Sequence, residues 1–175
     1  SQNTNKMCPV NPIEAKINSN DFFESLPQYT KIFLGDLNPK SPLISFDGEK
    51  LFFTTENEVR EDIYSVKKTG DNSWSKPILE SELLNKNEVY NHLSASYSNF
   101  YLKGGASYSK GTNETGFEIL DAQFQLLEKI KISAYNNYDD YASATITSDQ
   151  KTLILGIETD MTQGGHDLYF SHKKA

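Results

Sequence analysis

Three segments of the chain share one pattern, and a repeat of fixed length constrains the fold more than any other feature. The segments are SPLISFDGEKLFFTTE from Ser41, HLSASYSNFYLKGG from His92 and SATITSDQKTLILGIE from Ser143. Aligned, they place Ser45, Ser96 and Thr147 51 residues apart. Each copy begins with a short alternating strand, continues through a polar turn and enters a strongly apolar strand. The pattern predicts a β-hairpin in each copy.

The turns of these hairpins have residues suited to reversing the chain. Asp47-Gly48 is a strong hairpin signal, because glycine accepts positive φ and the aspartate can bond to nearby backbone. Asp149 keeps the aspartate, and Gln150 takes the place of the glycine. The middle copy is two residues shorter and turns at Ser98-Asn99. A metal-binding or catalytic role for Asp47 and Asp149 is the alternative to capping the turn.

The second half of each copy also repeats. After a variable polar loop come EDIYSVKK at Glu61, TGFEILDA at Thr115 and GHDLYFSH at Gly165, each predicted to be a third strand. We expect a fourth strand near Trp74–Leu79 in the first copy and near Leu126–Ile132 in the second. ILESELLNKNE and AQFQLLEKIKIS have roughly helical apolar spacing, so short helices are the alternative there.

Four strands in about 50 residues fit a propeller blade better than a sandwich or a helical solenoid. We therefore expect an all-β protein, a β-propeller of which about three four-stranded antiparallel blades are visible. Residues 1–30 are predicted to be an irregular N-terminal arm or to contribute a strand, and residues 31–175 to form the blades. The approximate repeats are 41–91, 92–142 and 143–175. Because closed propellers need at least four blades, we expect a longer chain, the N-terminal arm or a second chain to complete the ring.

At these motifs the sequence resembles the TolB-type, WD-repeat-like blades of bacterial cell-envelope proteins, which often carry an OmpA-like domain further along. The resemblance rests on ISFDGEKLFFTT, on EDIYSV with the turn KKTGDNSWSKPI, and on GGHDLYFSHK, and it covers roughly Pro42 to Ala175. It implies a periplasmic, outer-membrane-associated or secreted protein of a Gram-negative bacterium. It also implies structural roles for Asp47, Gly48, Asp62, Tyr64, Trp74, Asp149, Asp167 and Tyr169.

Charge and composition exclude several classes of partner. With 17 Lys and Arg against 24 Asp and Glu, the formal net charge is −7, whereas nucleic acids and anionic lipids attract basic surfaces. No apolar run is long enough to span a bilayer, so we expect neither nucleic-acid binding nor membrane insertion. Cys8 is the one cysteine, interpreted as a free thiol, and the histidines form no zinc pattern. No cofactor is expected.

The candidate ligand-binding residues are tyrosines of variable segments, because loop aromatics often anchor protein interfaces. They are Tyr90, Tyr108, Tyr135, Tyr138 and Tyr141. Packing at the edges of blades is the alternative role for the last three. Asp139 and Asp140 lie between them and offer oxygen ligands of the kind that calcium prefers, although their order does not fit an EF-hand loop.

The repeat and the resemblance together favour a non-catalytic interaction module that binds a protein partner through the loops of its blades. One alternative is a propeller-type enzyme acting on glycans, which needs carboxylates from different blades to meet. Asp62, Glu118 and Asp167 hold similar places in the three copies and are the candidates. Another alternative is a structural subunit that completes or plugs a larger envelope assembly. The pattern leaves the oligomeric state open.

Overall fold

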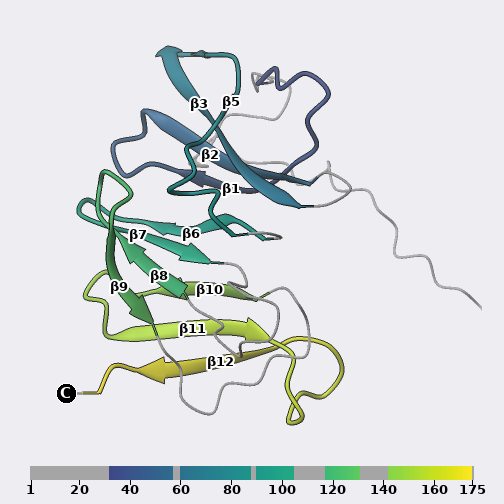
Figure 1. The fold of residues 1–175 in the computed structure, drawn as a ribbon, viewed down its shortest axis with the longest axis vertical. Coiled ribbons are helices and arrows are strands. Elements are labelled where there is room, and N and C mark those ends of the chain that lie inside the picture. Colours follow the sequence, from purple (N-terminus) through teal and green to yellow (C-terminus); the bar gives the residue numbers. More distant parts are fainter. Residues whose placement is uncertain (1–31, 57–59, 88–89, 105–116, 131–141, 175) are drawn as a thin grey trace, which may run out of the picture. The chain divides into compact units, whose positions relative to one another are not determined.

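A computed structural model describes residues 32–56, 60–87, 90–104, 117–130 and 142–174 (Figure 1). The chain divides into two compact units, Ser1–Ile32 and Phe33–Ala175, and all the described strands belong to the second unit. The predicted boundary between residues 30 and 31 stays a prediction. As predicted, the described part of the chain is all-β, with twelve strands and no helix. It follows that no described helix could cross a membrane.

The strands form three antiparallel sheets that follow one another along the chain (Figure 1). The first sheet contains β1 (Pro39–Ile44), β2 (Lys50–Glu56), β3 (Glu61–Gly70), β4 (Ser73–Trp74) and β5 (Ile78–Leu79), with β4 and β5 both paired to β3. The second contains β6 (His92–Ser96), β7 (Tyr101–Gly104), β8 (Phe117–Leu120) and β9 (Leu126–Ile130). The third contains β10 (Ser143–Ile146), β11 (Thr152–Ile157) and β12 (Asp167–His172). Within each sheet, neighbouring strands are mostly consecutive in the chain.

The predicted fourth strands are present in the first two sheets. β5 lies within the range expected for the first copy and β4 overlaps its start, and β9 lies within the range expected for the second. The helical alternative is wrong over the described part of both segments, since residues 82–84 form a turn and Leu126–Ile130 is a strand. A closed ring is not among the described features, so the propeller itself stays a prediction.

The three hairpins are equivalent in hydrogen bonding, but the middle one is displaced by one residue from the sequence alignment. In each hairpin the amide that opens the turn donates to the carbonyl that closes it: Ser45 to Lys50, Tyr97 to Phe100 and Thr147 to Thr152, at 2.7, 2.9 and 2.9 Å. Tyr97, and not Ser96, is therefore the counterpart of Ser45. The middle turn is two residues shorter, by one residue on each side of its tip. Between the first and middle copies, residues that are equivalent in the structure are therefore 52 apart before the turn and 50 apart after it, and not 51.

Two buried clusters join the sheets. The first contains Leu102 and Ile119 of the second sheet together with Leu153 and Leu155 of the third. The second cluster joins the first and second sheets; its buried members are Phe52, Ile63, Leu84, Leu93 and Leu120. Because successive residues of a strand point to opposite faces, the second sheet contributes one face to each cluster. The second sheet is therefore packed on both sides.

Candidate functional site

The turn aspartates hold their hairpins through hydrogen bonds. Asp47 Oδ1 accepts the amide of Glu49 at 3.0 Å and the hydroxyl of Ser45 at 2.6 Å, and Gly48 follows with a φ of 75°. Asp149 makes the matching pair of hydrogen bonds in the third sheet, at 3.0 and 2.5 Å. The hydroxyl first, and then the amide, hold the pKa of each carboxyl below its ordinary value. Both carboxylates are thus occupied by the turns that they cap.

The other motif residues lie on strands of the first and third sheets. Tyr64 lies on β3, and Trp74 is half-buried on β4. On β12, Tyr169 packs against the cluster shared by the second and third sheets. Asp167 begins that strand and accepts the amide of Gln163 at 3.1 Å. The contacts of Tyr169 and Asp167 thus stabilise a strand and a loop.

Of the tyrosines predicted to bind a ligand, Tyr90 is the one that the structure describes. It is half-buried before β6, and its backbone carbonyl accepts a hydrogen bond from Asn87 at 3.0 Å. The other candidates lie outside the described residues, namely Tyr108, Tyr135, Tyr138 and Tyr141, the calcium candidates Asp139 and Asp140, and Cys8. Their roles stay predictions.

The three carboxylates considered for glycan hydrolysis are each held by a different neighbour. Asp62 forms an ion pair with Arg60 at 2.5 Å. Glu118 pairs with Lys86 at 2.6 Å, and Asp167 binds a loop amide. A pair of carboxylates on either side of a scissile bond needs both groups to face the same open site. These contacts give each carboxylate a separate structural task.

A buried charge pair lies on the second sheet where the other two sheets have apolar residues. Lys103 on β7 and Glu118 on β8 are opposite each other in the strand register, and both are buried. The same cross-strand position is held by Phe53 and Tyr64 in the first sheet and by Leu155 and Tyr169 in the third. The second sheet has therefore exchanged both members of an apolar pair for two opposite charges.

Burial also sets the ionisation of this region. It lowers the pKa of Lys103 to about 8, against the opposing influence of Glu118. His92 begins β6 and is buried as well; burial first, and then Lys103 and Lys40, lower the pKa of its imidazole to about 4. At neutral pH the imidazole is therefore uncharged and Lys103 is mostly protonated. Lys103 and His92 therefore belong to the buried interior and not to an open site.

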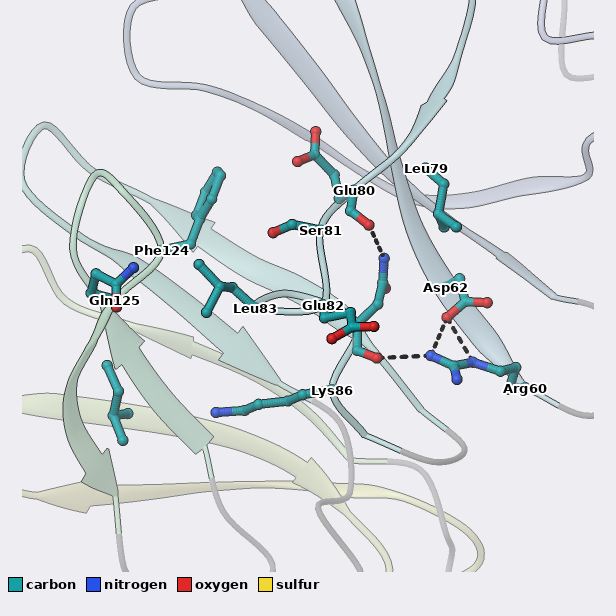
Figure 2. A pocket seen from close by; sticks show the side chains of 12 residues that line it. Arg60, Asp62, Leu79, Glu80, Ser81, Glu82, Leu83, Lys86, Phe124 and Gln125 are labelled. Carbon is teal, nitrogen blue, oxygen red and sulfur yellow. Dashed lines mark hydrogen bonds and ion pairs between the residues drawn. The ribbon is translucent and has the colours of Figure 1, made fainter.

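A groove of about 1040 Å³ opens between the first sheet and the second (Figure 2). One wall comes from the start of β3, from β5 and from residues 80–86, and the other from Phe124–Leu126 at the β8–β9 hairpin. Figure 2 shows Leu83 and Lys86 extending from the 80–86 segment toward this hairpin. The groove is open, and its walls come from two sheets.

The polar side chains at the first-sheet end of the groove are bound to one another or to the backbone. Asn85 Oδ1 accepts the amide of Ile63 at 2.7 Å, and its Nδ2 donates to the carbonyls of Ile63 and Glu80, each at 3.0 Å. Arg60 pairs with Asp62 and donates to the Asn85 carbonyl at 2.8 Å (Figure 2). These groups fix the shape of the wall, which leaves the apolar side chains to make contact with a ligand.

Exposed leucines give the groove its apolar surface. Leu79, Leu83 and Leu126 are 56%, 44% and 46% exposed, and all three line the groove. Glu82, also exposed, adds an acidic group between two of them. Exposed apolar side chains gathered in a depression with a polar rim are typical of protein-binding surfaces.

Phe124 holds the hairpin wall in a strained conformation. Its φ is 64°, a left-handed value that a bulky residue seldom adopts. Asp121 caps the turn by accepting the amides of Gln123 and Gln125 at 2.9 and 2.8 Å. The Phe124 ring lies 5.9 Å from Phe52 and 5.2 Å from Tyr101, so packing against both sheets offsets the backbone strain.

No sequence pattern singled out Leu83, Asn85 or Phe124. A signal for the turn was available, because Asp121 stands three residues before the left-handed residue and can cap a turn, but phenylalanine gives no hint of positive φ. Comparison of the chain with protein-family models, curated proteins and solved structures found no match. Over the described ranges, no three His, Cys, Asp or Glu side chains gather as metal ligands would. The site is therefore interpreted from its own geometry.

Proposed function

We propose that this chain is a non-catalytic β-propeller interaction module of the bacterial cell envelope, and that it binds a protein partner in the groove. The observation that carries the proposal is the combination of exposed leucines with charged groups that are already paired to one another. Such a surface gains free energy by excluding water from apolar side chains and needs no reactive residue.

The antiparallel sheets support the propeller part of this proposal. Each has the strand order of a blade, and two of them contain the fourth strand that the repeat predicts. The envelope location rests on the resemblance of the repeated motifs to TolB-type blades. A propeller suits a binding function, because its sheets form a rigid frame for loops and for grooves between neighbouring blades.

The groove also indicates the kind of segment that would bind. Leu83 and Leu126 can receive an apolar side chain from opposite walls. Glu82 and the net charge of −7 favour basic residues on either side of that anchor. We therefore expect a partner segment with an apolar residue between lysines or arginines.

The test is affinity capture of detergent-solubilised envelope proteins from a Gram-negative bacterium, with the immobilised chain as bait. Leu83→Glu and Leu126→Glu place a charge on each wall of the groove. We expect both variants to weaken capture of the same protein by about tenfold or more, since interface anchors of this kind typically contribute more than 1 kcal/mol.

The matched control is Met161→Glu, which adds the same charge to an exposed residue outside the groove. It should retain the captured protein at the wild-type level, and circular dichroism should show that all variants keep their β-structure. Equal capture by the wild type and both groove variants would contradict the proposal. Retention of cell-wall oligosaccharides in place of a protein would favour the glycan alternative.

A further inference from the structure

Lys50 contacts both walls of the groove without lining it. It is the first residue of β2, and its ammonium group forms an ion pair with Glu80 Oε1 at 2.6 Å. The same ammonium group lies over the ring of Phe124, 5.6 Å from the ring centre. Glu80 and Phe124 belong to opposite walls (Figure 2). One side chain therefore connects the 80–86 segment to the β8–β9 hairpin.

On the first wall, Glu80 is fixed by the strand beside it. Its carboxylate also accepts the hydroxyl of Ser65, a fully buried residue of β3. Its backbone amide donates to the carbonyl of Ile63 at 3.0 Å, and its own carbonyl accepts Nδ2 of Asn85. The side chain of Glu80 is 7% exposed, so its ion pair with Lys50 is shielded from water and stronger than a surface pair.

On the second wall, the ring of Phe124 is held from two sides. The ammonium group of Lys50 lies 4.8 Å from the centre of the Phe52 ring as well, and Phe52 packs edge-on against Phe124. A cation within about 6 Å of a ring centre is attracted to the face of the ring. Because the φ of Phe124 is strained, the hairpin depends on such contacts to keep its conformation. Leu126, which lines the groove, follows two residues later.

The repeat shows that the fold itself does not require a lysine at position 50. Lys50 closes the turn of the first hairpin, and the residues that close the turns of the second and third hairpins are Phe100 and Thr152. An aromatic and a small polar residue thus occupy the same strand position in the other sheets. The lysine is specific to the first sheet, which provides one wall of the groove.

We infer that Lys50 is a positioning residue for partner binding, and that it holds the two walls of the groove at the spacing that the partner segment needs. The role in binding rests on the proposed function, whereas the spacing follows from the contacts of Lys50. With the ammonium group in place, Leu83 and Leu126 stay at a fixed distance on opposite walls. A preorganised groove binds more tightly, because its walls lose little conformational freedom when the partner enters.

The spacing can be measured directly by double electron–electron resonance between spin labels on the two walls. The labels are attached at Glu82→Cys and Gln125→Cys, two exposed positions, with Cys8→Ser in the background. We expect one narrow distance distribution in this parent chain. Lys50→Met removes the ammonium group and should broaden the distribution. Lys50→Arg keeps a cation for both contacts and should retain the narrow distribution.

A second variant separates positioning from folding, because Lys50→Met leaves the carboxylate of Glu80 without its cation. In Lys50→Met/Glu80→Gln neither charge is left unpaired, and the amide oxygen can still accept the hydroxyl of Ser65. Circular dichroism should show a folded chain, and the distribution should still be broad. The matched control is Lys173→Met, which breaks an ion pair with Glu128 outside the groove and should leave the distribution narrow. Parent-like distributions in both Lys50 variants would overturn the inference.

A binding measurement connects the spacing to function. The probe is the synthetic peptide Thr-Lys-Leu-Lys-Thr, which has a leucine between two lysines, and its affinity is measured by isothermal titration calorimetry. Lys50→Met should weaken binding at least about fivefold, and Lys50→Arg should leave it unchanged. A broadened groove that binds the peptide as well as the wild type would overturn the role in binding. Equal affinity of the wild type and Leu83→Glu would instead contradict the proposed function, while the distance measurement decides separately whether Lys50 sets the spacing.

Discussion

Gly48 and Gln150 occupy equivalent positions in the hairpin turns of the first and third sheets. Each is the fourth residue of its turn, and each donates its amide to the carbonyl of the residue that opens the turn, at 2.8 Å. Both have positive φ, 75° and 58° respectively. A residue with a Cβ pays about 1–2 kcal/mol in this conformation, whereas glycine does not. The third hairpin is therefore strained where the first is not.

The first prediction concerns a substitution at each of these two positions. Gln150→Gly should raise the free energy of unfolding by about 0.5–1 kcal/mol, because relief of backbone strain exceeds the extra flexibility of glycine in the unfolded chain. Gly48→Ala should lower it by about 1 kcal/mol, with open space around the added Cβ. Urea denaturation measures both changes. A Gln150→Gly variant less stable than the wild type would contradict the role assigned to the left-handed position.

The second prediction concerns His92 and acid. The pKa of its imidazole is about 4 in the folded chain and 6.5 when unperturbed, so the unfolded chain binds the proton more readily. Stability should be unaffected by this group above pH 6.5 and should fall by about 3 kcal/mol as the pH drops from 6.5 to 4. The measurement is urea denaturation at several pH values, with His92→Gln as the control. Equal pH dependence in the two proteins would contradict the prediction.

At the scale of elements, the connection from the first sheet to the second depends on Asn91. Its side chain is fully buried; Oδ1 accepts the amide of Asn87, and Nδ2 donates to the carbonyls of Glu61 and Asn87, each at 3.0 Å. Its own carbonyl accepts the hydroxyl of Thr54 on β2 at 3.2 Å. One residue thus joins the linker to two strands of the first sheet.

The third prediction follows from this network. Asn91→Ala should reduce the free energy of unfolding by about 3 kcal/mol, because several buried backbone groups lose their partner. Asn91→Asp keeps the acceptor and loses the donors, so it should also destabilise. Asn99→Ala, at the exposed turn of the second sheet, provides the comparison and should have little effect. A small loss in Asn91→Ala, within the range of Asn99→Ala, would show that the linker tolerates its absence.

The sheets could be predicted from the sequence, whereas the groove could not. The LFF and LIL stretches that follow Asp turns, and the LYF stretch further along, are local signals, and β2, β11 and β12 formed where they predict strands. The groove depends on Asn85 reaching Ile63 and on Phe124 reaching Phe52, contacts between residues far apart in the chain. Their geometry follows from packing between two sheets, and no local pattern encodes it.

At the scale of the whole molecule, the second sheet couples the other two. It contributes Leu93 and Leu120 to one buried cluster, and Leu102 and Ile119 to the other. Neither cluster can lose the second sheet without exposing apolar side chains of its own. We therefore expect the described sheets to unfold as one cooperative unit.

The fourth prediction uses the single tryptophan as a reporter of that cooperativity. Trp74 lies in the first sheet, on β4. Leu155→Ala in the third sheet removes a buried side chain and should lower the stability by about 2–4 kcal/mol. The urea midpoint from Trp74 fluorescence should fall together with the midpoint from circular dichroism. A Trp74 transition that stays at its wild-type midpoint would show that the sheets unfold separately.

The exchange of an apolar pair for Lys103 and Glu118 bears on how a repeat protein can be engineered. A consensus of the three repeats has tyrosine at position 118, as at the equivalent positions of the first and third sheets. Consensus substitutions usually stabilise a protein. Here the single replacement would leave the buried Lys103 without the carboxylate opposite it, which is strongly destabilising. A consensus substitution at this position of the second sheet must therefore replace both members of the cross-strand pair, Lys103 and Glu118, in the same variant.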